Sequence, residues 1–292
     1  MPKTIIISAS TGAYFPLLDE MLSSLEPAAK RDGMDIGILD LGLGEGQRQN
    51  LRQRNVLMAV PPWDYDLSRF TQPPPPHFKA MTARPHLPKY FPGYEMYMWI
   101  DADCWVQRWD AAQLYLAAAA TKGFACTPEC DRSYVPFLTE MSVLAFALKC
   151  FRGSVDENAA LSLAQFPMIN SGVFAARADA PHWEKWSMAL GEALGKRNEA
   201  DFFVEQTALN IVVRTGRLAT ALLPSWCNWI CHRALPICTA DGSTFLDPQP
   251  PHQPLGIIHL TGNFKTGLWN LRSVLGDSRE CSLRFGASRG SR

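Results

Sequence analysis

Short apolar runs rich in β-branched and aromatic residues alternate with helix-like segments along most of this 292-residue chain. Such runs are typical of buried strands, and their alternation with helices favours a mainly parallel sheet. The expected strands cover residues 3–8, 34–39, 55–60, 96–100, 123–127, 168–176 and 256–260. The expected helices include residues 15–30, 78–90, 111–121, 181–194 and 201–213. The sequence therefore predicts an α/β protein with a doubly wound, mainly parallel sheet and flanking helices.

The composition is that of an ordinary globular protein, with 47% hydrophobic and 19% charged residues. A chain of this length can bury a large core. Basic and acidic residues balance at 28 each, so the net charge gives no indication of a nucleic-acid partner. No apolar stretch approaches membrane-spanning length, and residues 1–8 are too short and too soon polar for a signal peptide. We therefore expect a cytoplasmic protein that binds no nucleic acid.

The eight cysteines are expected to be reduced thiols in that compartment. Two pairs, Cys126/Cys130 and Cys227/Cys231, have a four-residue offset, and His232 follows the second pair. The pairs lie far apart in the chain and lack the two-residue spacing of common zinc sites. Free buried thiols are therefore favoured over a structural zinc site.

The strand expected at residues 96–100 stops abruptly at two acidic residues, Asp101 and Asp103. At the end of a strand, two acids separated by one small residue can point at the same place, where open α/β sheets bind their ligands. Carboxylate oxygens suit Mg²⁺ or Mn²⁺, and these cations in turn bind phosphates. We therefore expect a metal–diphosphate site, with a simple strand-to-turn cap as the alternative.

A second acidic pair with the same spacing, Asp64 and Asp66, stands in a different context. It follows Pro61-Pro62 in a loop-like segment, and no strand leads into it. We interpret this second pair as solvated surface.

Further motifs follow the first acidic pair in a fixed order. Arg84 stands one helix upstream of Trp99-Ile-Asp-Ala-Asp103, and Asn170-Ser-Gly-Val-Phe174 lies on a later apolar strand. Glu205-Gln-Thr-Ala-Leu-Asn210 lies on a helix, and His259-Leu-Thr-Gly-Asn-Phe-Lys265 comes near the C-terminus. Over residues 3–270 the order and spacing of these motifs resemble those of glycosyltransferase family 8. The members of that family are retaining enzymes that use nucleotide sugars and have the GT-A fold.

The chain departs from the family pattern at several positions. Glu205 and Thr207 stand where the family has aspartates, and the Pro-Trp after the lysine is loosened to Thr266-Gly-Leu-Trp269. The first strand ends in Ser8 and Ser10, where an aspartate is usual. A neighbouring retaining family with the same fold would also be compatible with these motifs.

The resemblance implies one nucleotide-sugar-binding domain of the GT-A type over residues 1–275. A polar, Arg-rich and flexible tail is expected over residues 276–292. The implied reaction transfers a hexose from a UDP-sugar to a hydroxyl of a glycan or glycolipid acceptor, with retention at the anomeric carbon. The implied cofactor is Mn²⁺ or Mg²⁺, which stabilises the charge that grows on the leaving diphosphate.

The resemblance also implies a role for individual side chains. The metal ligands would be Asp101, Asp103 and His259, and Asp101 would reach either the metal or the ribose. The residues expected to contact the donor are Ser8, Tyr14, Arg84, Asp101, Asn170, Ser171, Glu205, Gly262 and Lys265. Among these, Lys265 would reach the phosphates and Tyr14 would stack on the base.

Glu205 and Gln206 are the candidate catalytic residues. A carboxylate facing the sugar could bind a hydroxyl, support an oxocarbenium-like transition state or act as a nucleophile. In a front-face mechanism the leaving phosphate itself assists the acceptor, and neither residue is required as a nucleophile. Both mechanisms are compatible with the sequence.

Two other classes of function are alternatives to this one. A nucleotide-sugar-binding protein with impaired catalysis would account for the departures from the family motifs. A sugar nucleotidyltransferase would need a Gly-rich basic loop after the first strand, and residues 8–14 contain no lysine or arginine. The arginines of the expected tail could contact an anionic membrane surface, with simple disorder as the alternative (Arg279, Arg284, Arg289, Arg292).

Overall fold

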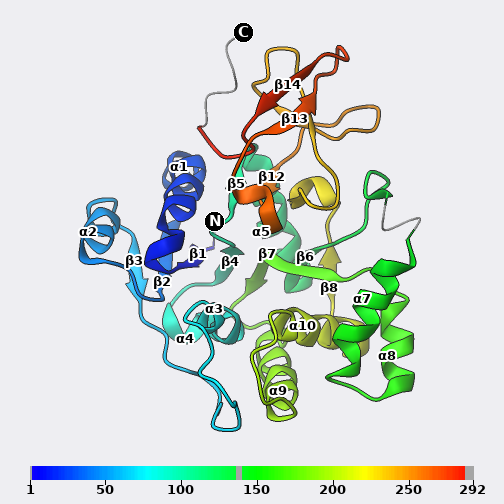
Figure 1. Ribbon diagram of the computed structural model, residues 1–292. Helices are drawn as coiled ribbons and strands as arrows, with labels where there is room; N and C mark the ends of the chain where they lie inside the picture. Colours follow the sequence, from blue (N-terminus) through cyan, green and yellow to red (C-terminus); the bar gives the residue numbers. More distant parts are fainter. Residues whose placement is uncertain (1, 136–139, 287–292) are drawn as a thin grey trace.

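A seven-stranded sheet forms the centre of the molecule in the computed structural model, which describes residues 2–135 and 140–286 (Figure 1). Its strands lie in the order β3-β2-β1-β4-β7-β6-β8. Their bounds are β1 Thr4–Ser10, β2 Asp35–Asp40, β3 Leu57–Ala59, β4 Met96–Ile100, β6 Phe124–Pro128, β7 Ile169–Arg177 and β8 Thr220–Leu222. Strand β7 is antiparallel to both of its neighbours, and the other neighbouring pairs are parallel. The expected mainly parallel α/β architecture is confirmed.

Side chains of the central strands alternate between two apolar layers. On β4, Met96, Met98 and Ile100 face one layer, whereas Tyr97 and Trp99 face the other. Helices α1 (Phe15–Arg31), α2 (Glu45–Gln53) and α5 (Trp109–Lys122) pack in the first layer. Helices α3 (Phe78–Ala83), α4 (Leu87–Tyr90), α9 (His182–Gly195) and α10 (Val204–Thr215) pack in the second. Because β4 is covered on both faces, its sequence is continuously apolar up to the acidic pair.

A second, three-stranded sheet lies beside the carboxyl end of β4 (Figure 1). It contains β5 (Cys104–Val106), β12 (Ile257–His259) and β9 (Trp229–Ile230), with β12 in the middle. Strand β5 runs antiparallel to β12, and their register places Cys104 opposite His259. Two short strands of this sheet, β5 and β9, lie outside the ranges that the sequence predicted as strands.

The remaining elements surround these two sheets. Helices α7 (Met141–Arg152) and α8 (Glu157–Ala164) share a small core of their own. Strand β10 (Ile237–Cys238) pairs with β11 (Phe245–Leu246). The short 3₁₀ helices are η1 Gly12–Tyr14, η2 Arg84–His86, η3 Ser225–Cys227 and η4 Gly262–Lys265. Over residues 2–135 and 140–286, no helix combines the length and apolarity that crossing a membrane requires.

The structure corrects the expected start of the loose tail at residue 276. Strand β14 (Ser278–Cys281) pairs antiparallel with β13 (Trp269–Arg272). Cys281 and Leu283 are buried, and Arg284 forms an ion pair with Glu20 on α1. Only Cys281 of this strand is apolar, so its pairing with β13 rather than its composition makes it a strand. Residues 287–292, with Arg289 and Arg292, lie outside the described part of the chain.

Candidate metal and donor site

The acidic pair occupies a tight turn between β4 and β5. The backbone N–H of Asp101 donates to the carbonyl of Gly172 on β7, at 2.8 Å. The carbonyl of Asp103 accepts from the N–H of Leu260, at 2.8 Å, directly after β12. The turn is therefore fixed to the central sheet on one side and to the small sheet on the other, which holds both carboxylates at the same edge.

Asp103 lies between a histidine and a lysine that come from the far end of the chain. Its Oδ1 is 3.5 Å from Nε2 of His259, and its Oδ2 is 2.9 Å from Nζ of Lys265. Burial opposes ionisation of Asp103, but the His259 ring and the Lys265 ammonium outweigh it and hold the pKa of Asp103 well below its usual range. Oδ2 of Asp101 is 4.0 Å from the same His259 nitrogen. The three expected metal ligands are thus neighbours.

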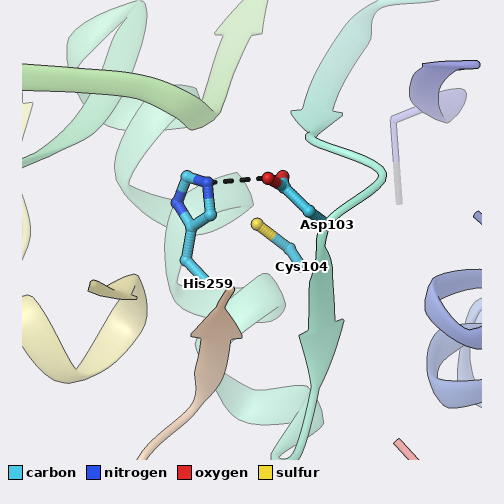
Figure 2. A group of neighbouring side chains, drawn as sticks. All are labelled: Asp103, Cys104 and His259. Carbon is cyan, nitrogen blue, oxygen red and sulfur yellow. Dashed lines mark ion pairs between the residues drawn. The ribbon is translucent and has the colours of Figure 1, made fainter. Parts of the chain in front are cut away.

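Cys104 also belongs to this group, although the sequence analysis did not select it. Figure 2 shows its sulfur beside Asp103 and His259, and one ligand atom from each of the three residues lies within 4.8 Å of the others. Burial, with the carboxylates of Asp103 and Asp101 nearby, raises the pKa of the Cys104 thiol. A thiol that keeps its proton is a poor metal ligand, so the donors here that suit a divalent metal ion are the carboxylate oxygens and the imidazole nitrogen.

Gly172 leaves the space in which these side chains meet. A Cβ atom at this position would lie 2.5 Å from Cε1 of His259 and 2.7 Å from Oδ2 of Asp101. Such contacts are far below normal van der Waals distances, so a side chain would displace the ligands. The glycine that interrupts the apolar strand β7 is therefore explained by the close approach of the site residues.

Arg84 connects the acidic turn to the start of helix α10. Its guanidinium donates to Asp101 and to Glu205, and it lies over the ring of Trp99, with 4.9 Å between Cζ and the ring centroid. Burial opposes the charge of Arg84, but Asp101 and Glu205 outweigh this effect and raise its pKa. Oδ1 of Asp101 also accepts from the indole N–H of Trp99, at 2.7 Å. Only Oδ2 of Asp101 is left for a ligand.

Glu205 is a buried carboxyl group with one oxygen in use. Its Oε2 accepts from Arg84 and from the hydroxyl of Ser171, whereas its Oε1 has no hydrogen-bond partner among the described residues. Burial raises the pKa of Glu205 to about 7, although Arg84 acts in the opposite direction. A buried acceptor without a partner is expensive in an apolar protein interior, which makes Oε1 a candidate contact for a ligand hydroxyl.

Asn170 and Gln206 belong to a closed network around Glu129, a residue that the sequence analysis missed. Nδ2 of Asn170 donates to Glu129 at 3.0 Å, and Nε2 of Gln206 donates to the same oxygen at 3.3 Å. Arg233 forms an ion pair with the other oxygen of Glu129. Glu129 follows β6 directly, so the rule that selected Asp101, an acid just after a buried strand, could also have selected Glu129.

The other residues expected to contact the sugar donor, Tyr14, Gly262 and Ser8, differ in how far they are exposed. Tyr14 is 43% exposed, and its hydroxyl lies within hydrogen-bonding reach of Lys265. Gly262 has a φ of +61° at the start of the 3₁₀ helix that carries Lys265, which favours glycine there. Ser8 is buried inside β1, and its hydroxyl has no partner among the described residues.

The second acidic pair is only partly the solvated surface that was expected. Asp66 is exposed and accepts from the backbone N–H of Ser68 at 2.9 Å. The side chain of Asp64, however, is 1% exposed, because it binds the hydroxyl of Tyr90 and the ammonium of Lys89. The prediction for Asp64 was wrong, since the sequence does not show that Tyr90 would cover it.

Three comparisons with known proteins bear on this arrangement. No protein-family model matches the sequence, and no curated protein sequence matches it significantly. The solved structure of the galactosyltransferase LgtC, in complex with donor and acceptor sugar analogues, matches with a TM-score of 0.57 at 15% identity. That match covers 89% of this chain and 87% of LgtC. The bifunctional glycosyltransferase WbbM matches with a TM-score of 0.52 at 14% identity, over 78% of this chain and 40% of WbbM.

The chain therefore has the GT-A fold of these glycosyltransferases, as the order of its motifs predicted.

Proposed function

We propose that this protein is a metal-dependent retaining glycosyltransferase that transfers a hexose from a UDP-sugar to a hydroxyl of a glycan or glycolipid acceptor. The observation that carries the proposal is the convergence of Asp101, Asp103 and His259 with Lys265 at the carboxyl end of β4. Carboxylates and an imidazole suit a divalent cation, and an ammonium beside them suits a diphosphate. The GT-A fold supports the same class of reaction.

A divalent cation, Mn²⁺ or Mg²⁺, would be held by Oδ2 of Asp101, by Asp103 and by Nε2 of His259. When bound, such an ion stabilises the negative charge that develops on the leaving diphosphate. Asp103 is suited to this role because carboxylate oxygens are preferred ligands of these hard cations. Arg84 holds the other oxygen of Asp101 and thereby keeps Oδ2 turned toward His259.

Lys265 would bind the diphosphate. Its ammonium lies 2.9 Å from Asp103 and beside Tyr14, on a short 3₁₀ helix that begins at Gly262. An ammonium there adds a point charge for the phosphates. Tyr14, which is partly exposed, and Ser8, whose hydroxyl has no partner within residues 2–135 and 140–286, would contact the nucleoside end of the donor.

Glu205 would accept a hydrogen bond from a hydroxyl of the donor sugar through Oε1, which has no partner in the described part of the chain. Arg84 and Ser171 already occupy Oε2, which fixes the orientation of the carboxyl group. Gln206, the next residue on α10, presents an amide, and an amide is a poor nucleophile. These features favour a front-face reaction, in which the leaving phosphate assists the acceptor hydroxyl, over a covalent glycosyl intermediate.

The test is to incubate the protein with Mn²⁺ and a panel of UDP- and GDP-sugars, and to measure nucleotide release with and without acceptor sugars. Turnover of one UDP-sugar that stops on chelation of the metal is the expected result. Tight, metal-dependent UDP binding without any turnover would instead identify a catalytically impaired nucleotide-sugar-binding protein. Turnover of GDP-sugars only would replace the proposed donor.

A further inference from the structure

Two buried asparagines connect the candidate metal ligand His259 to the interior of the protein. Nδ1 of His259 lies 3.1 Å from Oδ1 of Asn228, and Nδ2 of Asn228 lies 3.0 Å from Oδ1 of Asn170. His259, Asn228 and Asn170 are 3%, 0% and 7% exposed, so water does not compete for these hydrogen bonds. The three side chains come from β12, from the loop before β9 and from β7.

Groups whose hydrogen-bonding sense cannot be reversed fix the orientation of the Asn170 amide. The backbone N–H of Gly172 can only donate, and it donates to Oδ1 of Asn170 at 2.9 Å. Glu129, ionised in its pair with Arg233, can only accept, and it accepts from Nδ2 of Asn170 at 3.0 Å. A flip of the Asn170 amide would place its amino group against the N–H of Gly172 and its carbonyl oxygen against the carboxylate of Glu129.

The fixed amide of Asn170 determines that of Asn228, which in turn determines the proton on His259. Oδ1 of Asn170 accepts, so the atom of Asn228 that faces it must be the donor Nδ2. Oδ1 of Asn228 is then left for Nδ1 of His259, and a carbonyl oxygen can only accept. Nδ1 must therefore carry a hydrogen, and Nε2 is the nitrogen that faces Asp101 and Asp103.

We propose that Asn228 and Asn170 are positioning residues, which keep the neutral His259 ring in its Nδ1–H tautomer and so reserve Nε2 for the cation. The proposal rests on the proposed function for the identity of the cation. Partners of this kind, which bind the second nitrogen of a ligand histidine, orient the ring and raise its basicity. Glu129 and the backbone N–H of Gly172 contact Asn170, and they set the direction of the hydrogen bonds that lead from Asn170 through Asn228 to His259.

This arrangement changes the role expected for Asn170. Its carbonyl oxygen accepts from Gly172 and Asn228, and its amino group donates to Glu129 and to Gln206. An asparagine side chain has two donor and two acceptor positions, and all four are occupied here. Asn170 therefore has no free group for a sugar hydroxyl, and it acts through His259 instead.

Substitutions of Asn228 separate the two functions of its amide. Asn228→Leu removes both hydrogen bonds at similar volume, whereas Asn228→Asp keeps an acceptor for Nδ1 of His259. Asn210→Leu is the matched control, because Asn210 is also buried and hydrogen-bonded but its side chain binds Ile169 and Gln206 rather than His259. The ¹⁵N chemical shifts of the neutral His259 ring report the tautomer directly, without metal or substrate.

The wild-type protein, Asn228→Asp and Asn210→Leu are expected to show the Nδ1–H form, and Asn228→Leu is expected to gain the Nε2–H form. Mn²⁺ affinity, measured by electron paramagnetic resonance, should fall ~10–100-fold in Asn228→Leu and stay near the wild-type value in Asn228→Asp. If Asn228→Leu does not fold, wild type and Asn228→Asp still decide the tautomer. A wild-type ring with its proton on Nε2 overturns the proposal, as does an Asn228→Leu variant with unchanged tautomer and Mn²⁺ affinity. If the wild type bound no Mn²⁺, the proposed metal dependence would fail, while the tautomer would still decide this inference.

Discussion

The chain contains two Asp-x-Asp pairs, and the structure gives them opposite surroundings. Asp101 and Asp103 follow a buried strand, and each keeps one oxygen directed at His259. Asp64 has no such oxygen, because Tyr90 and Lys89 occupy both of its carboxylate atoms. Asp66 binds its own turn through the N–H of Ser68.

The difference shows that spacing alone does not make a metal site. A carboxylate can serve a cation only if the fold leaves one of its oxygens without a permanent donor and brings other ligands to it. At the first pair, Arg84 and Trp99 occupy one oxygen of Asp101 and so orient the other. At the second pair, Lys89 and Tyr90 bind Asp64 and the N–H of Ser68 binds Asp66, so both carboxylates hold a loop in place.

Removal of Asp103 should have the largest effect. We expect Asp103→Ala to lower the Mn²⁺-dependent affinity for UDP by more than ~100-fold, because loss of a ligand should exceed the cost of losing an outer partner. Isothermal titration calorimetry with and without Mn²⁺ measures the effect. Asp66→Ala, which changes the corresponding member of the other pair, is the control and should bind like the wild type. Unchanged Mn²⁺-dependent affinity in Asp103→Ala would refute the site assignment.

Each pair has one acid that is bound by a lysine: Lys265 binds Asp103, and Lys89 binds Asp64. Substituting the two lysines therefore tests whether the pairs differ in function. Lys265→Gln should lower UDP affinity ~10-fold or more, because a charge-assisted contact to the phosphates is lost. Its affinity for Mn²⁺ alone should be retained or raised, since the ammonium no longer competes for Asp103. Lys89→Gln should change neither affinity. Equal losses of UDP and Mn²⁺ binding in Lys265→Gln would contradict this role.

Glu205 is connected to Asp101 of the first pair by Arg84, which binds both carboxylates. Its ionisation makes the stability of the folded protein depend on pH. Its pKa is raised to about 7 in the folded protein, above the ordinary value of 4.5. Its contribution to stability is therefore fully present below pH 4.5 and is lost as the pH rises through about 7. Relative to Glu205→Gln, the wild type should lose up to ~3 kcal/mol of unfolding free energy across this window. Urea unfolding at several pH values measures the difference, and parallel pH profiles would rule out the raised pKa.

Asp64 should matter for stability and not for ligand binding. Asp64→Ala removes the partner of the Tyr90 hydroxyl, and we expect a loss of ~1 kcal/mol in urea unfolding. Mn²⁺-dependent UDP affinity should stay at the wild-type value. A clear fall in that affinity would mean that the second pair also serves the ligand, and the contrast between the two pairs would disappear.

The sequence predicted the parts of the site that chain order and local pattern encode. Asp101 and Asp103 end a strongly apolar strand, and His259 and Lys265 have a distinctive spacing, so their proximity could be expected. Asn228 could not, because it lies in an irregular loop and acts only through contacts with β7 and β12. Cys104 is next to Asp103 in sequence, but only the register of β5 against β12 brings it opposite His259.

The fold was predictable to a similar depth. Long apolar or periodic segments such as β4 and α9 encode their secondary structure locally. The sequence predicted their bounds to within a few residues. Strands of two to four residues, such as β9 and β14, are stabilised by their partners rather than by their own sequence. The strand at Ser278–Cys281 was therefore mistaken for a tail.

The small sheet of β5, β12 and β9 affects how the chain is made. Strand β5 leaves the ribosome about 150 residues before its partner β12, whereas every strand of the central sheet, the last of which is β8, precedes β12 in the chain (Figure 1). During that interval Cys104–Val106 is an apolar edge without a neighbour, which is a template for association with other chains. We therefore expect premature termination just before Ile257 to yield an aggregation-prone product that contains every strand of the central sheet.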